Sequence, residues 1–410
     1  MLSTIKKISI KSLAIAISLG SVFSAQSNVV NNTELTVEEL RIDKAIKSMP
    51  DVALRLSARV DEFTQQVNQA TNYTVLTQLV IRHGTGLWLD AKTSFNQLND
   101  VDDRPLYWAR IQMSKALRSS KTFADLFSNQ QEKLLWSLEL ISRGQMDIKF
   151  DKNTDKKILL TGFDPFFLDK HIDQSNPSGV VALSLDDIVV SMEGQTAEVE
   201  VLIVPVRFAD FDQGMIEELL KPYIADKSVD MVLTVSMGRE NFDLERYPAL
   251  RRSANAPDNL NILTGATKSN PLVPKLHNAE LRGPEFVEFS LPISSMLKGS
   301  GKYQVNDNRK VSTLSGGAFN GQALVDLIKQ TSVSGSGGGY LSKDGYSFND
   351  ELPQSGLANE IAYRTSLLNS LQVSEVRVGH ISTPDIVGYN PSEVKDIVKQ
   401  ITSIITLGSK

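Results

Sequence analysis

The segment Ile158-Leu159-Leu160-Thr161-Gly162 indicates the architecture of this chain. It is a short apolar run that ends in a turn, as a strand buried in a parallel sheet does. Three similar runs follow, at 199–206, 231–235 and 376–381. Helical patterns separate or follow these runs, at 178–185, 214–224, 360–371 and 392–407. Strands that alternate with helices predict a doubly wound α/β domain with a mainly parallel sheet.

Upstream of this domain, the pattern between residues 33 and 146 is helical. Apolar residues recur there at spacings of three and four, which predicts three to five helices in a bundle or cap. A charged linker, 151–157, separates the two patterns. We therefore expect a helical domain over 28–150 and an α/β domain over 155–410. Two polar, turn-rich stretches near 260–316 and 343–358 are interpreted as insertions at the rim of the sheet.

The first 26 residues have the pattern of a secretory signal peptide. Lysines at positions 6, 7 and 11 precede an apolar run over 12–23, and small residues follow at 24–27. That run is too short to span about 30 Å of hydrocarbon comfortably, so cleavage is favoured over a retained anchor. The sequence predicts a periplasmic or secreted protein that has no membrane attachment after cleavage.

Composition excludes several classes of function. The net charge is -5, so no basic field favours nucleic acid. The 410 residues include no cysteine, which excludes disulfides, thiolate metal sites and a thiol nucleophile. The four histidines are far apart in the sequence. We therefore expect no histidine-rich metal site and no cofactor, while carboxylates remain able to bind a hard cation.

Four segments at the expected carboxyl ends of strands carry the candidate chemistry, since parallel sheets bind ligands there. They are Thr161–Phe166 with Asn176-Pro177-Ser178, Gly238-Arg239 with Glu245-Arg246, Val333–Ser342, and Val378–Pro384. In this order they resemble the motifs of pyroglutamyl peptidase I, a cysteine exopeptidase family, over about residues 157–390. The resemblance implies that family's fold for the α/β domain.

The first segment resembles the family's TGFxPFGG and NPS motifs. By that resemblance, Phe163 and Phe166 wall the pocket for the pyrrolidone ring, and Asn176 belongs to the binding segment. A flat neutral lactam suits an aromatic slot that has a few hydrogen bonds for orientation. The family's two glycines are Phe167 and Leu168 in this chain.

The second segment resembles the family's GRxxIxxERxAxN signature, and Pro257-Asp258-Asn259 fits the PDN that follows it. The resemblance places Glu245 on the carboxylate that orients the catalytic histidine, and Arg239 on a binding position. The family's closing asparagine is Leu250 here.

The third and fourth segments depart from the family where its catalysis resides. Alignment with VSxxAGTYxCN puts Ser342 on the nucleophilic cysteine and Tyr340 on a pocket aromatic. Alignment with GFIHVP puts Ser382 on the catalytic histidine, while His380 lies two residues earlier. Residues two apart in a strand face the same side, roughly 6–7 Å apart. His380 is therefore a candidate base, with packing or a surface contact as the alternative.

Three hypotheses for function remain open. The first is a protein without catalysis that binds a peptide N-terminus or a small lactam-like ligand. The second is an active pyroglutamyl aminopeptidase that uses Ser342, His380 and Glu245. The third is an interaction protein that acts through its helical domain. Members of the family often associate, so self-association is compatible with each hypothesis.

Overall fold

The predicted parallel strands form the centre of a seven-stranded sheet with the order β2-β3-β1-β4-β12-β5-β8. The computed structural model describes residues 32–98, 101–319, 324–337, 356–372 and 375–410. The four central strands are β1 (Lys156–Phe163), β3 (Gln195–Val204), β4 (Met231–Met237) and β12 (Arg377–Thr383). They are mutually parallel. The mainly parallel α/β architecture is confirmed.

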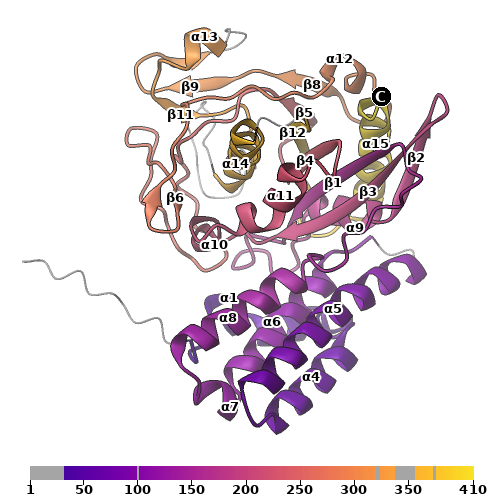
Figure 1. Cartoon of the computed structure of the whole chain (residues 1–410), viewed down its shortest axis with the longest axis vertical. Helices are drawn as coiled ribbons and strands as arrows, with labels where there is room; N and C mark the ends of the chain where they lie inside the picture. Colours follow the sequence, from indigo (N-terminus) through magenta and orange to yellow (C-terminus); the bar gives the residue numbers. More distant parts are fainter. Residues whose placement is uncertain (1–31, 99–100, 320–323, 338–355, 373–374) are drawn as a thin grey trace, which may run out of the picture. The chain divides into compact units, whose positions relative to one another are not determined.

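The two faces of the sheet are covered by different helices (Figure 1). Helices α9 (Pro177–Leu185) and α15 (Pro391–Gly408) share one apolar cluster with Ile158 and Leu160. Helices α11 (Met215–Ala225) and α14 (Leu357–Leu371) bury Leu159 in a second cluster on the opposite face. Successive residues of a strand point to opposite faces, so the continuous apolar run of β1 reflects burial on both sides.

Close packing of α9 on the sheet depends on Gly162. A β-carbon at this position would clash with the carbonyl oxygen of Ser178 and lie 2.7 Å from the Ser178 carbonyl carbon. The glycine therefore lets the first turn of α9 lie directly against β1, at the end of the strand where the candidate site begins.

The remaining strands of the main sheet flank the four central ones, and the periodicity did not predict them. Strand β2 (Ile188–Met192) pairs antiparallel with β3. Strand β5 (Phe242–Glu245) pairs antiparallel with β12, and β8 (Val305–Asn308) pairs parallel with β5. Strand β5 pairs with the carboxyl-terminal half of β12. The last residue of β5, Glu245, therefore lies beside the predicted site.

The N-terminal region is helical, as predicted, but its described residues form eight helical segments where three to five helices were expected. Its helices are α1 (Val37–Leu40), α2 (Ile42–Ser48), α3 (Pro50–Ala53), α4 (Ser57–Gln69), α5 (Tyr73–Leu98), α6 (Arg104–Arg118), α7 (Lys121–Ala124) and α8 (Ser128–Ile141). Residues 32–410 form one compact unit, in which these helices pack with the α/β part. Among the described residues, no helix combines the length and apolar character needed to cross a bilayer.

Buried charges join the helices to the loop after β1. Asp164 accepts hydrogen bonds from Nη1 of Arg110 at 2.9 Å and from Nη1 of Arg143 at 2.7 Å. The three side chains are almost fully buried. Asp103 accepts from the Ser175 hydroxyl at 2.5 Å and from the Asn176 backbone N–H at 3.0 Å. The helical region therefore holds the segment that carries the first family-like motif.

The stretch 260–316 is more ordered than the loops that its composition indicates. It contains the hairpin of β6 (Lys275–Leu276) and β7 (Ala279–Glu280), and helix α12 (Ile293–Met296). It also supplies β8 to the main sheet and β9 (Val311–Thr313) to a three-stranded sheet with β10 (Gly317–Phe319) and β11 (Ser332–Ser334). Helix α13 (Leu324–Leu327) lies between β10 and β11 in the chain. Most of the second predicted insertion, 343–355, lies outside the described residues.

Candidate functional site

A row of polar side chains lies buried on two central strands of the sheet. In the register of β4 and β12, Thr234 is opposite His380, and Ser236 is opposite Ser382. All four side chains are buried. The period of two in each strand puts them on the face covered by α11 and α14. The predicted common orientation of His380 and Ser382 is consistent with this arrangement.

Glu245 and Ser382 are in direct contact. The Ser382 hydroxyl donates to Oε1 of Glu245 at 2.7 Å. Nδ2 of Asn308, at the end of β8, donates to Oε2 at 2.7 Å. The structure therefore brings together two residues that lie 137 positions apart. They are the residues that the motif alignment places on the family's carboxylate and histidine.

The environment of Glu245 favours its neutral form. Burial raises the pKa of this carboxyl well above its usual range, and the nearby Asp243 raises it further. Hydrogen bonds from Ser382, Ser336 and Asn308 act in the opposite direction. A buried carboxyl group with a strongly shifted pKa is typical of functional sites, although structural networks of charges also produce such shifts.

His380 is fully buried, and both ring nitrogens have hydroxyl partners. Nδ1 lies 2.8 Å from Oγ1 of Thr234, and Nε2 lies 2.8 Å from Oγ of Ser236. Thr234 also donates to the Gly379 carbonyl oxygen at 3.2 Å. We infer that Nδ1 carries the proton and that Nε2 accepts from Ser236, since this assignment satisfies each group.

Burial lowers the pKa of His380 to about 3. The imidazole is therefore neutral at neutral pH and is a weak base. Among the described contacts, His380 forms no hydrogen bond with Glu245 or Ser382. His380 and Glu245 nevertheless lie on either side of the same glycine. A β-carbon on Gly337 would lie 3.4 Å from Cδ2 of His380 and 3.5 Å from Cγ of Glu245. The burial and the hydrogen bonds of His380 favour a structural role for this residue. The hydroxyl group that its imidazole is able to polarise is that of Ser236.

The aromatic residues of the predicted pocket are more enclosed than an open slot requires. Phe163 is 4% exposed and stacks on Phe211, with ring centroids 6.3 Å apart. Phe166 is half-buried, and its ring centroid lies 4.5 Å from that of Phe167. Phe166 therefore offers more accessible surface to a ligand than Phe163 does.

Asn176 and Arg239 have different local roles. Asn176 caps the N-terminus of α9 by accepting from the Ser178 backbone N–H, and its Nδ2 donates to the Asp164 carbonyl oxygen at 2.9 Å. It thus fixes the loop between the two halves of the first motif. Arg239 is exposed just after β4, and its carbonyl oxygen accepts from the backbone N–H of Asp385. Tyr340 and Ser342 lie outside the described residues.

Four polar residues that sequence reasoning did not single out surround Glu245 and His380: Thr234, Ser236, Asn308 and Ser336. The first two left a signal, because they interrupt the apolar run of β4 at a spacing of two. The hydroxyl of Ser336 accepts from the backbone N–H groups of Arg246 and Tyr247 at 2.9 and 2.8 Å. Ser336 lies within the third candidate segment, Val333–Ser342, although that segment was singled out for Tyr340 and Ser342. Asn308 reaches the site from a distant segment, and no local pattern indicates this.

A cavity lies at the opposite ends of the strands. It has a volume of about 370 Å³ and is lined by Lys156, Asp230 and Arg377, among others. These residues begin the strands or precede them. Ligands of parallel sheets bind at the carboxyl ends, so we place the candidate site at Glu245 and not in this cavity. Of the described residues, Asp186, Asp187 and Glu200 form the grouping that could hold a metal, and it is separate from Glu245.

Two family models match the chain. Residues 23–139 match the PA0049 N-terminal domain, and residues 157–280 match the PA0049 C-terminal domain. The protein known as Uncharacterized protein PA0049, from Pseudomonas aeruginosa, is 31% identical over 201 residues. That match covers 43% of this chain and 36% of the relative, so the chain spans about a third of the length of the relative.

Among solved structures, the chain is similar to pyrrolidone carboxyl peptidases from Pyrococcus furiosus. A mutant form has a TM-score of 0.38 at 18% identity, over 62% of this chain and 97% of that chain. A structure described together with its cys-free mutant has a TM-score of 0.39 at 16% identity, with the same coverage. These scores indicate a partly matched architecture, and no functional argument rests on them. The chain is thus similar to PA0049 in both its helical and its α/β part.

Proposed function

We propose that this chain is an exported protein that binds a pyroglutamyl residue, or a similar peptide N-terminus, without hydrolysing it. The observation that carries the proposal is the buried contact between Ser382 and Glu245 at 2.7 Å. It joins the two positions that the motifs align with the family's histidine and its orienting carboxylate. The contact supports that alignment, in which a serine stands where the family has its base.

The replacement argues against the family's hydrolysis. A serine hydroxyl has no basic lone pair comparable to that of imidazole, so Ser382 is unable to activate a nucleophile. The chain also lacks cysteine. Loss of a nucleophile or of its base costs on the order of a million-fold in triad enzymes. The pair of substitutions is therefore expected to leave binding without turnover.

Binding of a neutral ring is supported by the surroundings of the retained motifs. Phe166 provides half-buried aromatic surface at the end of β1. The carboxyl group of Glu245 is shifted toward its neutral form, and such a group is able to donate a hydrogen bond to a lactam carbonyl. A neutral, flat ligand needs no compensating charge in such a site.

One observation favours a second candidate, a serine hydrolase. Oγ of Ser236 lies 2.8 Å from Nε2 of His380, which is the contact that links a nucleophile to its general base. The low pKa of His380 makes it a poor base, and Nδ1 faces Thr234 where active triads place a carboxylate. We therefore rank it below binding, and it differs from the hypothesis based on Ser342.

Amine release from a fluorogenic pyroglutamyl amide separates these candidates. The proposal predicts no release above the rate without protein. Release that is abolished by Ser236→Ala and retained in Ser342→Ala would establish the second candidate. Release that requires Ser342 and Glu245 would instead establish the active peptidase.

A thermal-shift assay with pyroglutamate tests binding directly. We expect pyroglutamate to raise the melting temperature of the wild-type protein, with a smaller shift in Phe166→Ala. Phe127→Ala is the matched control, because Phe127 is 79% exposed at the start of α8. Equal shifts in both variants would contradict the assignment of Phe166 to the pocket. No shift in the wild-type protein would contradict binding.

Export is a separate part of the proposal, based on the pattern of residues 1–26. Expression with this N-terminus in a Gram-negative host should yield periplasmic protein whose intact mass shows cleavage between residues 24 and 27. Uncleaved protein in the cytoplasm would contradict it.

A further inference from the structure

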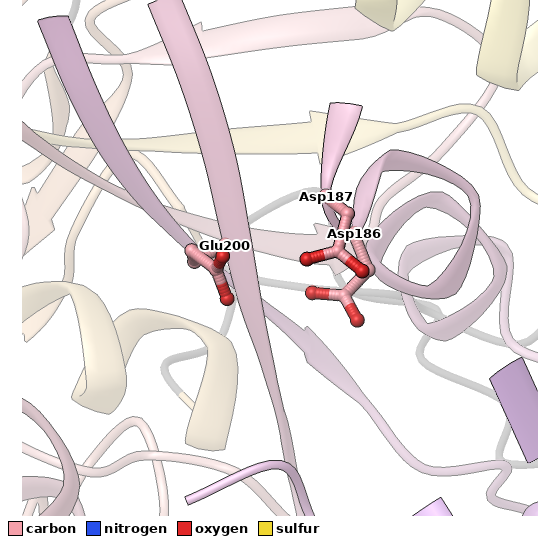
Figure 2. Close-up of side chains that lie close together, drawn as sticks. All are labelled: Asp186, Asp187 and Glu200. Atoms are coloured by element: carbon pink, nitrogen blue, oxygen red, sulfur yellow. The ribbon is translucent and has the colours of Figure 1, made fainter. Parts of the chain in front are cut away.

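A second cluster of carboxylates lies near the edge of the sheet where β2 begins, away from Glu245. Asp186 is the C-cap residue of α9, Asp187 follows it, and Glu200 lies in β3. One ligand oxygen from each lies within 4.8 Å of the others. Figure 2 shows the three carboxylates turned toward a common gap.

Lys92, on α5, compensates part of this charge. Its Nζ lies 2.6 Å from Oδ2 of Asp186, 2.8 Å from Oδ2 of Asp187, and 2.6 Å from Oδ2 of Asp147. Lys92 donates hydrogen bonds to Asp147 and Asp187. Oδ2 of Asp186 forms only an ion pair with Lys92 and has no hydrogen-bond partner among the described residues. None of these ion pairs of Lys92 includes Glu200.

Glu200 is the buried group that remains uncompensated. Its side chain is 1% exposed, and neither carboxylate oxygen has a hydrogen-bond partner among the described residues. A buried carboxylate without a partner is costly, and binding a metal ion is one of the few ways to compensate it.

We propose that Asp186, Asp187 and Glu200 bind a hard divalent cation of the Ca²⁺ or Mg²⁺ class. Carboxylate oxygens are the ligands that these ions prefer. With Asp147, the cluster has four carboxylates against the single charge of Lys92. A divalent ion brings the sum from three negative charges to one when all four are ionised. Asp187 is largely exposed, with its side chain at 63%, which gives the ion a route from solvent.

Trp88 provides a spectroscopic probe of this site. Its indole Nε1 donates to Oδ2 of Asp147 at 2.8 Å, and that oxygen also accepts from Lys92. The indole therefore lies beside the proposed ligands. Tb³⁺ has the same preference for carboxylate oxygens as Ca²⁺, and it emits when a neighbouring tryptophan transfers excitation energy to it.

The experiment is a titration of chelator-treated protein with Tb³⁺, under tryptophan excitation. We expect saturable Tb³⁺ emission that Ca²⁺ displaces. Trp88→Phe should abolish the emission and Trp136→Phe should retain it, because Trp136 donates to Glu218 on α11 and not to this cluster. Emission that persists unchanged in Trp88→Phe would place the ion elsewhere and overturn the proposal.

Two ligand variants test the cluster itself by calorimetric titration with Ca²⁺ and with Mg²⁺. Asp187→Asn and Glu200→Gln should each weaken cation binding by about tenfold or more. Mutation of a residue that only holds a metal ligand in place already causes a loss of that size. Glu200→Gln removes a buried charge, so its melting temperature without cation should equal or exceed that of the wild type. Glu132→Gln, at an exposed position on α8, is the control. Absence of saturable binding to the wild type, or equal affinities in all variants, would refute the site.

Discussion

At the scale of single residues, His380 shows how burial determines chemistry. Its imidazole lies between two hydroxyl groups, and burial lowers its pKa to about 3. The unfolded chain binds a proton at this residue below a pH of about 6.5, while the folded protein does not. Folding stability is therefore fully present above that pH and is lost as the pH falls toward 3.

The substitution His380→Gln should remove this acid dependence. We expect the free energy of unfolding of the wild type, relative to the variant, to fall by up to about 1.4 kcal/mol per pH unit below pH 6.5. Urea denaturation of both proteins between pH 7.5 and pH 5 measures the difference. Parallel pH profiles would mean that His380 is not held neutral.

The substitution Glu245→Gln tests a pKa that is shifted upward, in contrast to that of His380. The raised pKa means that the folded protein holds a proton that the unfolded chain releases above a pH of about 4.5. Stability from this group is thus present at low pH and is lost as the pH rises through the folded pKa. Glutamine keeps the shape without a charge, so the variant should gain stability relative to the wild type between pH 5 and pH 8. A constant difference across that range, from urea denaturation, would contradict this.

At the scale of elements, the sequence predicts what local pattern determines. The strands at Ile158, Val199, Met231 and Val376 were each predicted within a few residues, because strands buried on both faces are continuous apolar runs. The helices between them were placed equally well. The strands β2, β5 and β8 were missed. All three are short, and β5 and β8 pair with residues that are distant in the sequence. Strand β2 is the apolar arm of a hairpin with β3.

The packing of α9 on β1 gives a prediction at the same scale. Gly162→Ala should destabilise the protein by about 1–3 kcal/mol, because the added methyl meets backbone atoms of Ser178 that have no room to shift. Gly86→Ala is the comparison, since its methyl meets only the end of the flexible Arg59 side chain and alanine favours the helix. Denaturant unfolding should show a near-zero change there. Equal losses in both would contradict the argument from close packing.

At the scale of the whole molecule, the helical region and the α/β part share a buried charge network. Asp164→Asn should leave Arg110 and Arg143 without their common carboxylate and cost about 3–5 kcal/mol. Asp169→Asn is the matched control, because Asp169 pairs with Arg41 while its own side chain is 54% exposed. We expect a loss of about 1 kcal/mol or less there. Similar losses in a urea titration would argue that the network is not structural.

The candidate site was predictable only in part. The motifs placed Glu245 and Ser382 in chain order, and the structure brings these two together. The enclosure of Phe163 by Phe211 and the arrival of Asn308 from the stretch 260–316 depend on tertiary packing. No pattern of local spacing carries that information. The roles assigned to Ser342 and Tyr340 remain predictions, because both lie outside the described residues.

Binding without hydrolysis is tested most directly by calorimetric titration of the purified protein with a pyroglutamyl dipeptide. One instrument reports both properties, because binding gives a heat that saturates and turnover gives a heat flow that continues while substrate lasts. We predict saturation at one dipeptide per chain and a flat baseline after each injection. A sustained heat flow would show that the chain is an active peptidase, and no heat of binding would contradict the proposed ligand.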